Sequence, residues 1–550
     1  MKITTRLHKE YIEKYTKAGY WINRTLSEYL DEAVENYPDK EAVVDRDRRL
    51  TYRQLGQMVD RMALGLLELG IKRGDVVSFQ LPNWLEAVVI HHAAVRIGAI
   101  TSPILPIHRS TEIKYMLGHS ESSLLIIPQE FRRFDYANMV DGVRKELPAL
   151  KHVLVIGGNK LPEGMLSFEE FMETRWEERR DPLTLKSMKP DPNDVILIMF
   201  TSGTEAEPKG VLHTSNTLVH ECRSAIYTWQ LGEDDVILIA TPVTHIGGLL
   251  HGLEMPQMLK AKLVLMDVWN PDTAIEIIEK ERCTWTSGAT PFLLGITQSP
   301  ALAEHDISCL RSFPCGGAGV PPSLIRDFAS RFPACHTGRG YGSTEYPTVS
   351  VDLFDEPLDK ASERDGIPIM GTEVRIVDDD GREVPIGVSG EIVVRGPECF
   401  VGYLAPELNK IYFDEDGWFR TGDLGKLDED GYVEVTGRKK DIIIRGGENI
   451  SAKEIEDILY THPDISGAAI VGMPDSITQE KACAYVIPKP GRTITFDEMV
   501  SFLLKKNIAK QKFPERLEIV DKFPMTPSGK VQKFVLRQDI RKKLGYEPTK

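Results

Sequence analysis

An apolar run that ends abruptly in a loop of small polar residues constrains this chain most. Residues 195–200 read VILIMF, which is typical of a buried β-strand. The chain then continues as TSGTEAEPKGV, a loop of hydroxyls and glycines with Lys209 near its end. Glycines let backbone N–H groups approach a ligand, hydroxyls donate to phosphate oxygens, and lysine adds positive charge. This pattern favours a polyphosphate-binding turn, although the loop alone also fits an ordinary surface turn.

The loop does not fit the Walker A motif. That motif requires Gly, four residues, and then Gly-Lys-Ser/Thr. Here Pro208 precedes Lys209 and Gly210 follows it. Neither the second glycine nor the magnesium-binding hydroxyl is in its place, so the Walker interpretation is excluded.

Composition limits the class of protein. A chain of 550 residues is long enough for more than one domain, and its net charge of −15 argues against nucleic-acid binding. The seven cysteines are scattered and form no Cys-x-x-Cys pair, which indicates a reducing compartment rather than a zinc or disulfide framework. The first residues lack the apolar core of a secretory signal, and no run is long enough to span a membrane. We therefore expect a cytoplasmic protein without integral membrane association.

Strand and helix patterns alternate along the first 440 residues, which predicts parallel sheets covered by helices. His91 and His92 are neighbours on one predicted helix, so they point about 100° apart and cannot share a metal; we expect packing or surface roles. The expected helices are 51–69 and 83–98, and the expected strands are 76–81, one around Ile104, 124–127, 236–240 and 263–266.

The pattern of predicted helices and strands changes after Asp441. A short strand at 442–444 precedes helices near 452–460 and 496–505, which alternate with strands near 467–472 and 482–487. This pattern predicts a separate, compact α+β domain of about 110 residues.

Five further motifs are weak individually, because glycine clusters, core histidines and exposed lysines are common. Their order along the chain carries more information. They are TPVTHIG with His245, CGGAGVP at 315–321, GYGSTE at 340–345, Asp423 with GRKKD at 437–441, and PMTPSGK ending at Lys530.

Together with the phosphate loop, these motifs resemble those of the adenylate-forming superfamily, in particular acyl-CoA synthetases of the medium-chain or cyclohexanecarboxylate type. The resemblance covers about residues 21–540, and every fixed position of Pro-x-Thr-x-Ser-Gly-Lys matches. The phosphate loop departs from the family pattern at Glu205 and Ala206, which adds negative charge beside the phosphates. The resemblance implies an α/β fold: a large N-terminal domain (1–439) of two packed α/β layers plus a small β-barrel-like region, and a small mobile α+β C-terminal domain (440–550).

The resemblance also implies the site. Lys530, Glu345 and His245 would be catalytic, Thr204 and Glu345 would bind Mg²⁺, and Lys440 would be the hinge of the mobile domain. His245, where amino-acid-activating relatives carry an aspartate, argues for a plain carboxylic acid, and Gly342, where acetate-activating relatives carry tryptophan, argues for an acyl group larger than propionate. The implied contacts to ATP and coenzyme A are Thr201, Ser202, Gly203, Thr204, Lys209, Gly317, Ala318, Tyr341, Gly342, Thr344, Asp423, Arg438, Lys440, Gly446, Gly447 and Glu448.

The implied reaction is ATP-dependent formation of an acyl-AMP from a medium-chain, alicyclic or aromatic acid, followed by transfer to CoA. Three alternatives remain open: a ligase that loads a carrier protein, a luciferase-like oxidation, and a non-catalytic nucleotide-binding scaffold. The expected partners are the carboxylic acid, ATP and CoA, with a homodimer as a further possibility.

Overall fold

The computed structural model describes residues 3–158, 160–201, 207–526 and 529–546. Its largest sheet has seven strands in the order β11-β10-β4-β3-β5-β8-β9. Neighbours pair in parallel except β10 and β11, which are antiparallel. The strands are β3 (Val76–Phe79), β4 (Ile100–Pro103), β5 (Leu124–Pro128), β8 (His152–Ile156), β9 (Leu166–Ser167), β10 (Val195–Thr201) and β11 (Lys209–Thr214).

A second sheet of five strands, in the order β14-β12-β13-β1-β2, forms the other α/β layer. All twelve residues of helix α4 (Leu85–Arg96) are buried, and α4 shares one hydrophobic core with side chains of both sheets. The predicted pair of packed α/β layers is thus confirmed. The strands are β1 (Glu41–Asp45), β2 (Arg48–Thr51), β12 (Val236–Ile239), β13 (Lys262–Leu265) and β14 (Trp285–Thr286).

The predicted helices form, with shifted ends. Helix α3 (Tyr52–Glu68) starts after Thr51, whose side chain caps it. The helix expected from residue 83 begins only at Leu85, because the Asn83 side chain forms long-range hydrogen bonds instead of belonging to the helix. Its Nδ2 donates to the carbonyls of Ile239 and Thr241, 3.2 and 3.0 Å away, and so joins this layer to the end of β12.

His91 and His92 are fully buried packing residues, not surface residues. His91 Nδ1 lies 3.1 Å from Thr101 Oγ1, and His92 Nε2 lies 2.6 Å from the carbonyl of Leu253. Burial lowers the pKa of both imidazoles to about 3, so both are neutral.

Two smaller sheets follow the layers. One has the order β15-β16-β17-β18, and the other has four antiparallel strands in the order β19-β20-β21-β22. The second sheet corresponds to the region predicted to be β-barrel-like. The strands are β15 (Cys315–Gly316), β16 (Arg339–Tyr341), β17 (Ser350–Val351), β18 (Ile367–Pro368), β19 (Glu373–Val377), β20 (Gly390–Arg395), β21 (Phe419–Leu427) and β22 (Val433–Arg438).

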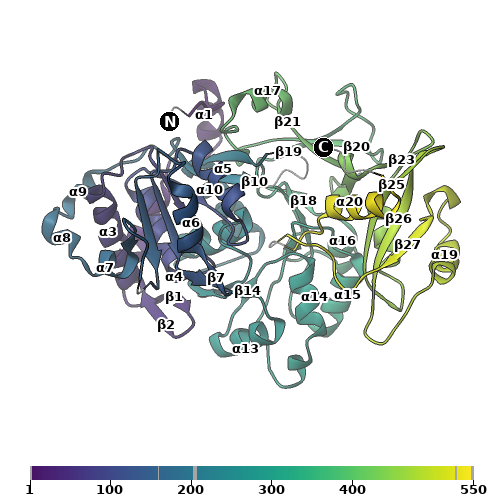
Figure 1. Ribbon diagram of the computed structural model, residues 1–550, viewed down its shortest axis with the longest axis horizontal. Helices are drawn as coiled ribbons and strands as arrows, with labels where there is room; N and C mark the ends of the chain where they lie inside the picture. Colours follow the sequence, from purple (N-terminus) through teal and green to yellow (C-terminus); the bar gives the residue numbers. More distant parts are fainter. Residues whose placement is uncertain (1–2, 159, 202–206, 527–528, 547–550) are drawn as a thin grey trace.

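The C-terminal α+β region forms its own sheet, β24-β23-β26-β25, with β27 beside β26, and its own hydrophobic cores. In Figure 1 it lies at the right, with the two α/β layers toward the left. Among the described residues, no helix combines the length and apolarity needed to cross a bilayer. The elements are β23 (Ile443–Arg445), β24 (Glu448–Ile450), α18 (Ala452–Leu459), β25 (Ile465–Asp475), β26 (Gln479–Pro488), α19 (Phe496–Lys505), β27 (Arg516–Ile519) and α20 (Lys533–Lys543).

Candidate active site

Two cavities meet at the end of β16, between the large domain and the C-terminal region. Cavity A has a volume of about 140 Å³ and cavity B of about 390 Å³. Both are lined by Gly317, Tyr341, Gly342 and Lys530. His245 and Thr344 line cavity A only, and Ala318, Asp423 and Arg438 line cavity B only. Motifs spread over more than 280 residues of sequence are therefore brought to one place.

Asp423 is the centre of a hydrogen-bonded cluster in cavity B. The Tyr341 hydroxyl donates to Asp423 Oδ2 at 2.8 Å, and Arg438 Nε lies 3.0 Å from Asp423 Oδ1. Burial and the charge of Asp423 raise the pKa of Tyr341, so the phenol keeps its proton. The same carboxylate raises the pKa of Arg438. Two of the carboxylate's lone-pair positions are used in this way, which leaves acceptor capacity for a ligand hydroxyl.

Lys530 reaches the junction of the two cavities from a turn before α20. Its backbone N–H donates to Thr526 Oγ1 at 3.0 Å, and its carbonyl accepts from the Thr526 N–H at 2.7 Å. Gly529 has φ +82, a left-handed backbone that suits glycine. Burial, and then the charge of Arg438, lower the pKa of Lys530 to about 8, while Asp423 and Glu345 act in the opposite direction. A partly desolvated ammonium interacts more strongly with nearby charge than one in water.

Glu345 and Lys209 lie close together on the side of the candidate site where the phosphate loop enters β11. Tyr403 connects them: its hydroxyl donates to Glu345 Oε1 at 2.9 Å and lies 3.4 Å from Lys209 Nζ. Lys209 Nζ is 3.9 Å from Glu345 Oε1. Among the described residues there is no group of three or more His, Cys, Asp or Glu side chains that could hold a metal. A single carboxylate of this kind fits Mg²⁺, which protein sites commonly bind through one or two carboxylates plus substrate phosphates.

His245 and Thr344 line cavity A. Burial, and then the charge of Lys530, lower the pKa of His245 to about 3, so its imidazole is neutral. Thr344 is held by His213, which no sequence motif singles out. His213 Nε2 lies 2.8 Å from the Thr344 carbonyl, and its Nδ1 lies 3.2 Å from Thr217 Oγ1. His213 and Tyr403 belong to no recognised motif, and only the folded chain places them here.

Gly342 has a local structural reason to be glycine as well as an effect on cavity size. A Cβ atom at this position would lie 2.0 Å from the Pro347 carbonyl oxygen. The backbone turns back here, since Ser343 N–H donates to the Tyr346 carbonyl at 2.8 Å. A tryptophan would therefore require the turn itself to move, and the glycine alone does not decide which acids fit.

The other predicted residues lie outside these two cavities or outside the described residues. Ser202, Gly203 and Thr204 lie outside the described residues, and Thr201 ends β10. Lys440 lies in the short turn Lys439–Asp441, and its charge contributes to lowering the pKa of Lys530. Three predicted CoA contacts are exposed and are not among the described residues lining cavity A or B: Gly446 and Gly447, in the turn between β23 and β24, and Glu448, the first residue of β24.

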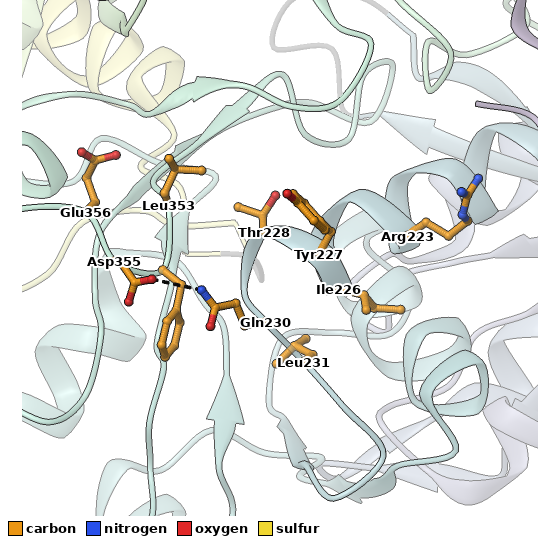
Figure 2. Close-up of a pocket in the computed structure, with 10 residues that line it drawn as sticks. Arg223, Ile226, Tyr227, Thr228, Gln230, Leu231, Leu353, Asp355 and Glu356 are labelled. Atoms are coloured by element: carbon orange, nitrogen blue, oxygen red, sulfur yellow. Dashed lines mark hydrogen bonds between the residues drawn. The ribbon is translucent and has the colours of Figure 1, made fainter. Parts of the chain in front are cut away.

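A third cavity, cavity C, is larger but lies elsewhere. It has a volume of about 830 Å³ and lies between helix α10 (Ser215–Thr228) and residues 353–356. Figure 2 shows Gln230 and Asp355 joined across it, with 3.1 Å between Gln230 Nε2 and Asp355 Oδ2. Its described lining includes none of the predicted site residues, so cavities A and B form the candidate site.

The chain matches two families: AMP-binding enzyme over residues 30–404, and AMP-binding enzyme C-terminal domain over residues 454–530. It is 36% identical to a medium-chain fatty-acid–CoA ligase of Escherichia coli, over 99% of this chain and 95% of that protein. It is 32% identical to a 2,3-dihydroxybenzoate-AMP ligase of Bacillus subtilis, over 97% of each. The crystal structure of ATP-bound MatB from Rhodopseudomonas palustris superposes with a TM-score of 0.84 and 27% identity, over 95% of this chain and 100% of that one. This chain belongs to the AMP-binding enzyme family, among the acyl-CoA synthetases and related adenylate-forming ligases.

Proposed function

We propose that this enzyme activates a carboxylic acid with ATP to give acyl-AMP and pyrophosphate, and then transfers the acyl group to CoA. The observation that carries the proposal is the position of Lys530. Its ammonium lies where cavities A and B meet, close enough to Asp423, Arg438 and Glu345 for their charges to shift its pKa. Cavity B would take the nucleotide, cavity A would take the acyl group, and the reacting oxygen would meet the α-phosphate at Lys530.

The nucleotide would be held mainly by cavity B. Asp423 would accept the two ribose hydroxyls, because a carboxylate offers two acceptor oxygens to a vicinal diol. Arg438 would reach ribose and phosphate, and Thr344 the α-phosphate. Tyr341 would stack on adenine beside Gly317 and Ala318. The phosphates would be bound by Thr201, Ser202, Gly203, Thr204 and Lys209.

Glu345, with Thr204, would hold Mg²⁺, which would supply positive charge to the phosphates. Tyr403 would orient Glu345 through the hydrogen bond to Oε1. It would act as a positioning residue.

The chemistry requires a cation at the junction. A carboxylate is a poor electrophile, because attack on it must expel oxide, whereas acyl-AMP expels a phosphate ester. In forming acyl-AMP, the carboxylate oxygen bonds to the α-phosphorus as the bond to pyrophosphate breaks. Lys530 would stabilise the negative charge that gathers there, by electrostatics rather than by proton transfer. Neutral His245 would border the carboxylate without adding a competing charge.

The pH dependence follows from the lowered pKa of Lys530. Below that pKa of about 8 the ammonium is charged, and above it the charge is lost. We expect kcat/KM for ATP in acyl-AMP formation, which reports groups of the free enzyme, to fall as pH rises through about 8. Stopped assays of acyl-AMP from about pH 6 to about pH 10 would measure this. A profile that stays flat over that range would contradict a charged Lys530.

The second half-reaction requires a rearrangement. The CoA thiol must reach the acyl carbon from the side that Lys530 occupies, and two groups cannot share one place. We propose that the domain beginning at residue 440 rotates about Lys440 and brings the turn at Gly446, Gly447 and Glu448 toward the CoA arm. A few residues at an element's end can absorb such a hinge motion.

Cavity A suggests the size of the acyl group. Its volume of about 140 Å³ is close to that of a cavity of roughly 150 Å³ that binds benzene in another protein. An acid with one ring, or a medium chain of similar volume, fits this space better than acetate. The medium-chain relative from Escherichia coli supports the same range.

Narrowing cavity A should change acid selection. A Cβ at Gly247 would meet only His245 Nδ1, at 4.0 Å, so a side chain there can enter the cavity without backbone strain. We expect Gly247→Leu to lower kcat/KM for cyclohexanecarboxylate by about tenfold or more through overpacking, and to affect propionate less. Gly142→Leu, at a helix position with open space around it, is the matched control. An equal fall for both acids would contradict the assignment of cavity A.

A carrier-protein ligase is the second candidate, because the relative from Bacillus subtilis is an AMP ligase. Incubation with ATP and a panel of carboxylic acids, with and without CoA, separates the two. Acyl-CoA detected by mass spectrometry supports the proposal, whereas acyl-AMP that accumulates without consuming CoA favours the carrier-protein candidate. Absence of pyrophosphate with every acid would favour the non-catalytic scaffold.

A cytoplasmic location and a homodimer are also part of the proposal. Analytical sedimentation would test the homodimer.

A further inference from the structure

We propose that Trp229 and His251, in the wall of cavity A, bind a hydroxyl substituent of the acyl group, so that the preferred acid is a hydroxylated one. This inference rests on the proposed function, because it specifies the chemistry of the acid that cavity A would take. It comes from buried polar atoms that have no hydrogen-bond partner among the described residues and that belong to an otherwise largely apolar wall.

Trp229 provides a donor. It follows helix α10, is 3% exposed, and lines cavity A. Its indole Nε1 has no hydrogen-bond partner among the described residues. Indole nitrogen only donates, and buried donors are rarely left unpaired in native proteins.

His251 provides the second group. Its Nδ1 lies 3.1 Å from Ser287 Oγ, and its Nε2 has no hydrogen-bond partner among the described residues. The two rings meet edge to face, with centroids 5.3 Å apart, so the two side chains contact each other in the wall of cavity A.

A buried carboxylate lies behind this wall. Glu221 Oε1 is 3.8 Å from His251 Nε2 and accepts a hydrogen bond from Thr348 Oγ1 at 3.0 Å. Glu221 Oε2 has no partner among the described residues. Thr348 also lines cavity A, so the polar groups converge on one side of it.

The residue types select the substituent. An alkyl group would leave the Trp229 and His251 nitrogens unpaired. An ammonium group only donates and could not accept from Trp229, and a second carboxylate would lie close to the buried carboxyl group of Glu221. A hydroxyl can accept from the indole and donate to His251. A site that pairs with a substrate hydroxyl discriminates strongly against the analogue that lacks it.

Trp285 supplies a matched control. It packs on Trp229 with ring centroids 5.2 Å apart, and its Nε1 is likewise unpaired among the described residues. Trp285 is not among the residues that line cavity A. An unpaired indole alone is therefore not sufficient; the inference rests on Trp229 and His251 both lining cavity A, with Glu221 behind His251.

The test compares matched acids in acid-dependent ATP–pyrophosphate exchange. The acids are benzoate with its three monohydroxy isomers, and hexanoate with 6-hydroxyhexanoate. We expect the unchanged enzyme to favour at least one hydroxy acid over its parent by about tenfold or more in kcat/KM. Trp229→Phe and His251→Phe should bring that ratio toward one, chiefly by lowering the value for the hydroxy acid, whereas Trp285→Phe should keep the ratio.

Two results would overturn the inference, and the first needs only the wild-type enzyme. If it uses both parent acids as well as every hydroxy acid, the wall binds no hydroxyl, and a resident water pairs the nitrogens instead. If Trp229→Phe lowers kcat/KM for parent and hydroxy acid equally, Trp229 has only a structural role, and this too contradicts the inference. Failure of every acid to support exchange overturns the proposed function itself, which distinguishes the two failures.

Discussion

Replacing Lys530 by alanine should slow acyl-AMP formation by at least about a hundredfold, the usual effect of removing a preorganised group that stabilises transition-state charge. Thioester formation from supplied acyl-AMP should remain largely intact. The reason is position: Lys530 lies between cavities A and B, where the carboxylate would meet the α-phosphate, and the second half-reaction no longer needs a cation at that point.

Lys522→Ala is the matched control, since Lys522 lies in the same C-terminal segment but is exposed to solvent. Both half-reactions are measured separately, acyl-AMP as acid-dependent pyrophosphate release and thioester from synthetic acyl-AMP and CoA. Unfolding temperatures establish that the variants are folded. Equal loss of the two half-reactions in Lys530→Ala would remove the lysine from its assigned role.

Lys440→Pro should impair thioester formation and spare acyl-AMP formation, the reverse of Lys530→Ala. Proline fixes φ near −65°, so a hinge at this residue loses the rotation that the second step requires. We expect thioester formation to fall by at least about tenfold while acyl-AMP formation is largely retained. Lys440 suits this role because it lies in the turn Lys439–Asp441, directly between β22 of the large domain and β23 of the C-terminal region.

Lys440→Ala separates the side chain from the backbone. It removes the ammonium but keeps the rotation, so its thioester rate should stay much closer to that of the unchanged enzyme. CoA transfer that is unaffected in Lys440→Pro would show that the hinge lies elsewhere. Loss in Lys440→Ala as large as in the proline variant would assign the effect to the side chain.

Local sequence predicts the elements of this fold well where burial and capping agree. The run at 195–200 becomes β10, and Thr51 caps α3, because both signals depend on neighbouring residues. The predicted start of α4 is wrong by two residues, since the Asn83 side chain donates hydrogen bonds to carbonyls 156 and 158 residues further along the chain. Such long-range use of a side chain has no local signature.

The residues of the candidate site also divide into those with a sequence signal and those that only long-range contacts reveal. Motif residues such as Lys530 and Asp423 could be selected from the sequence, and the structure places both on cavity B. Tyr403 and His213 could not, because they act on Glu345 and Thr344 through contacts 58 and 131 residues apart. The close approach of Gly342 to the Pro347 carbonyl was equally hidden, since it depends on how the turn folds back.

Acid-dependent exchange of labelled pyrophosphate into ATP, without CoA, shows directly whether Lys530 is required for acyl-AMP formation. Exchange requires reversible formation of an acyl-AMP and nothing from the second half-reaction. We expect exchange with acids of one ring or medium chain length, and we expect Lys530→Ala, but not Lys522→Ala, to abolish it. Exchange that Lys530→Ala retains in full would contradict the account.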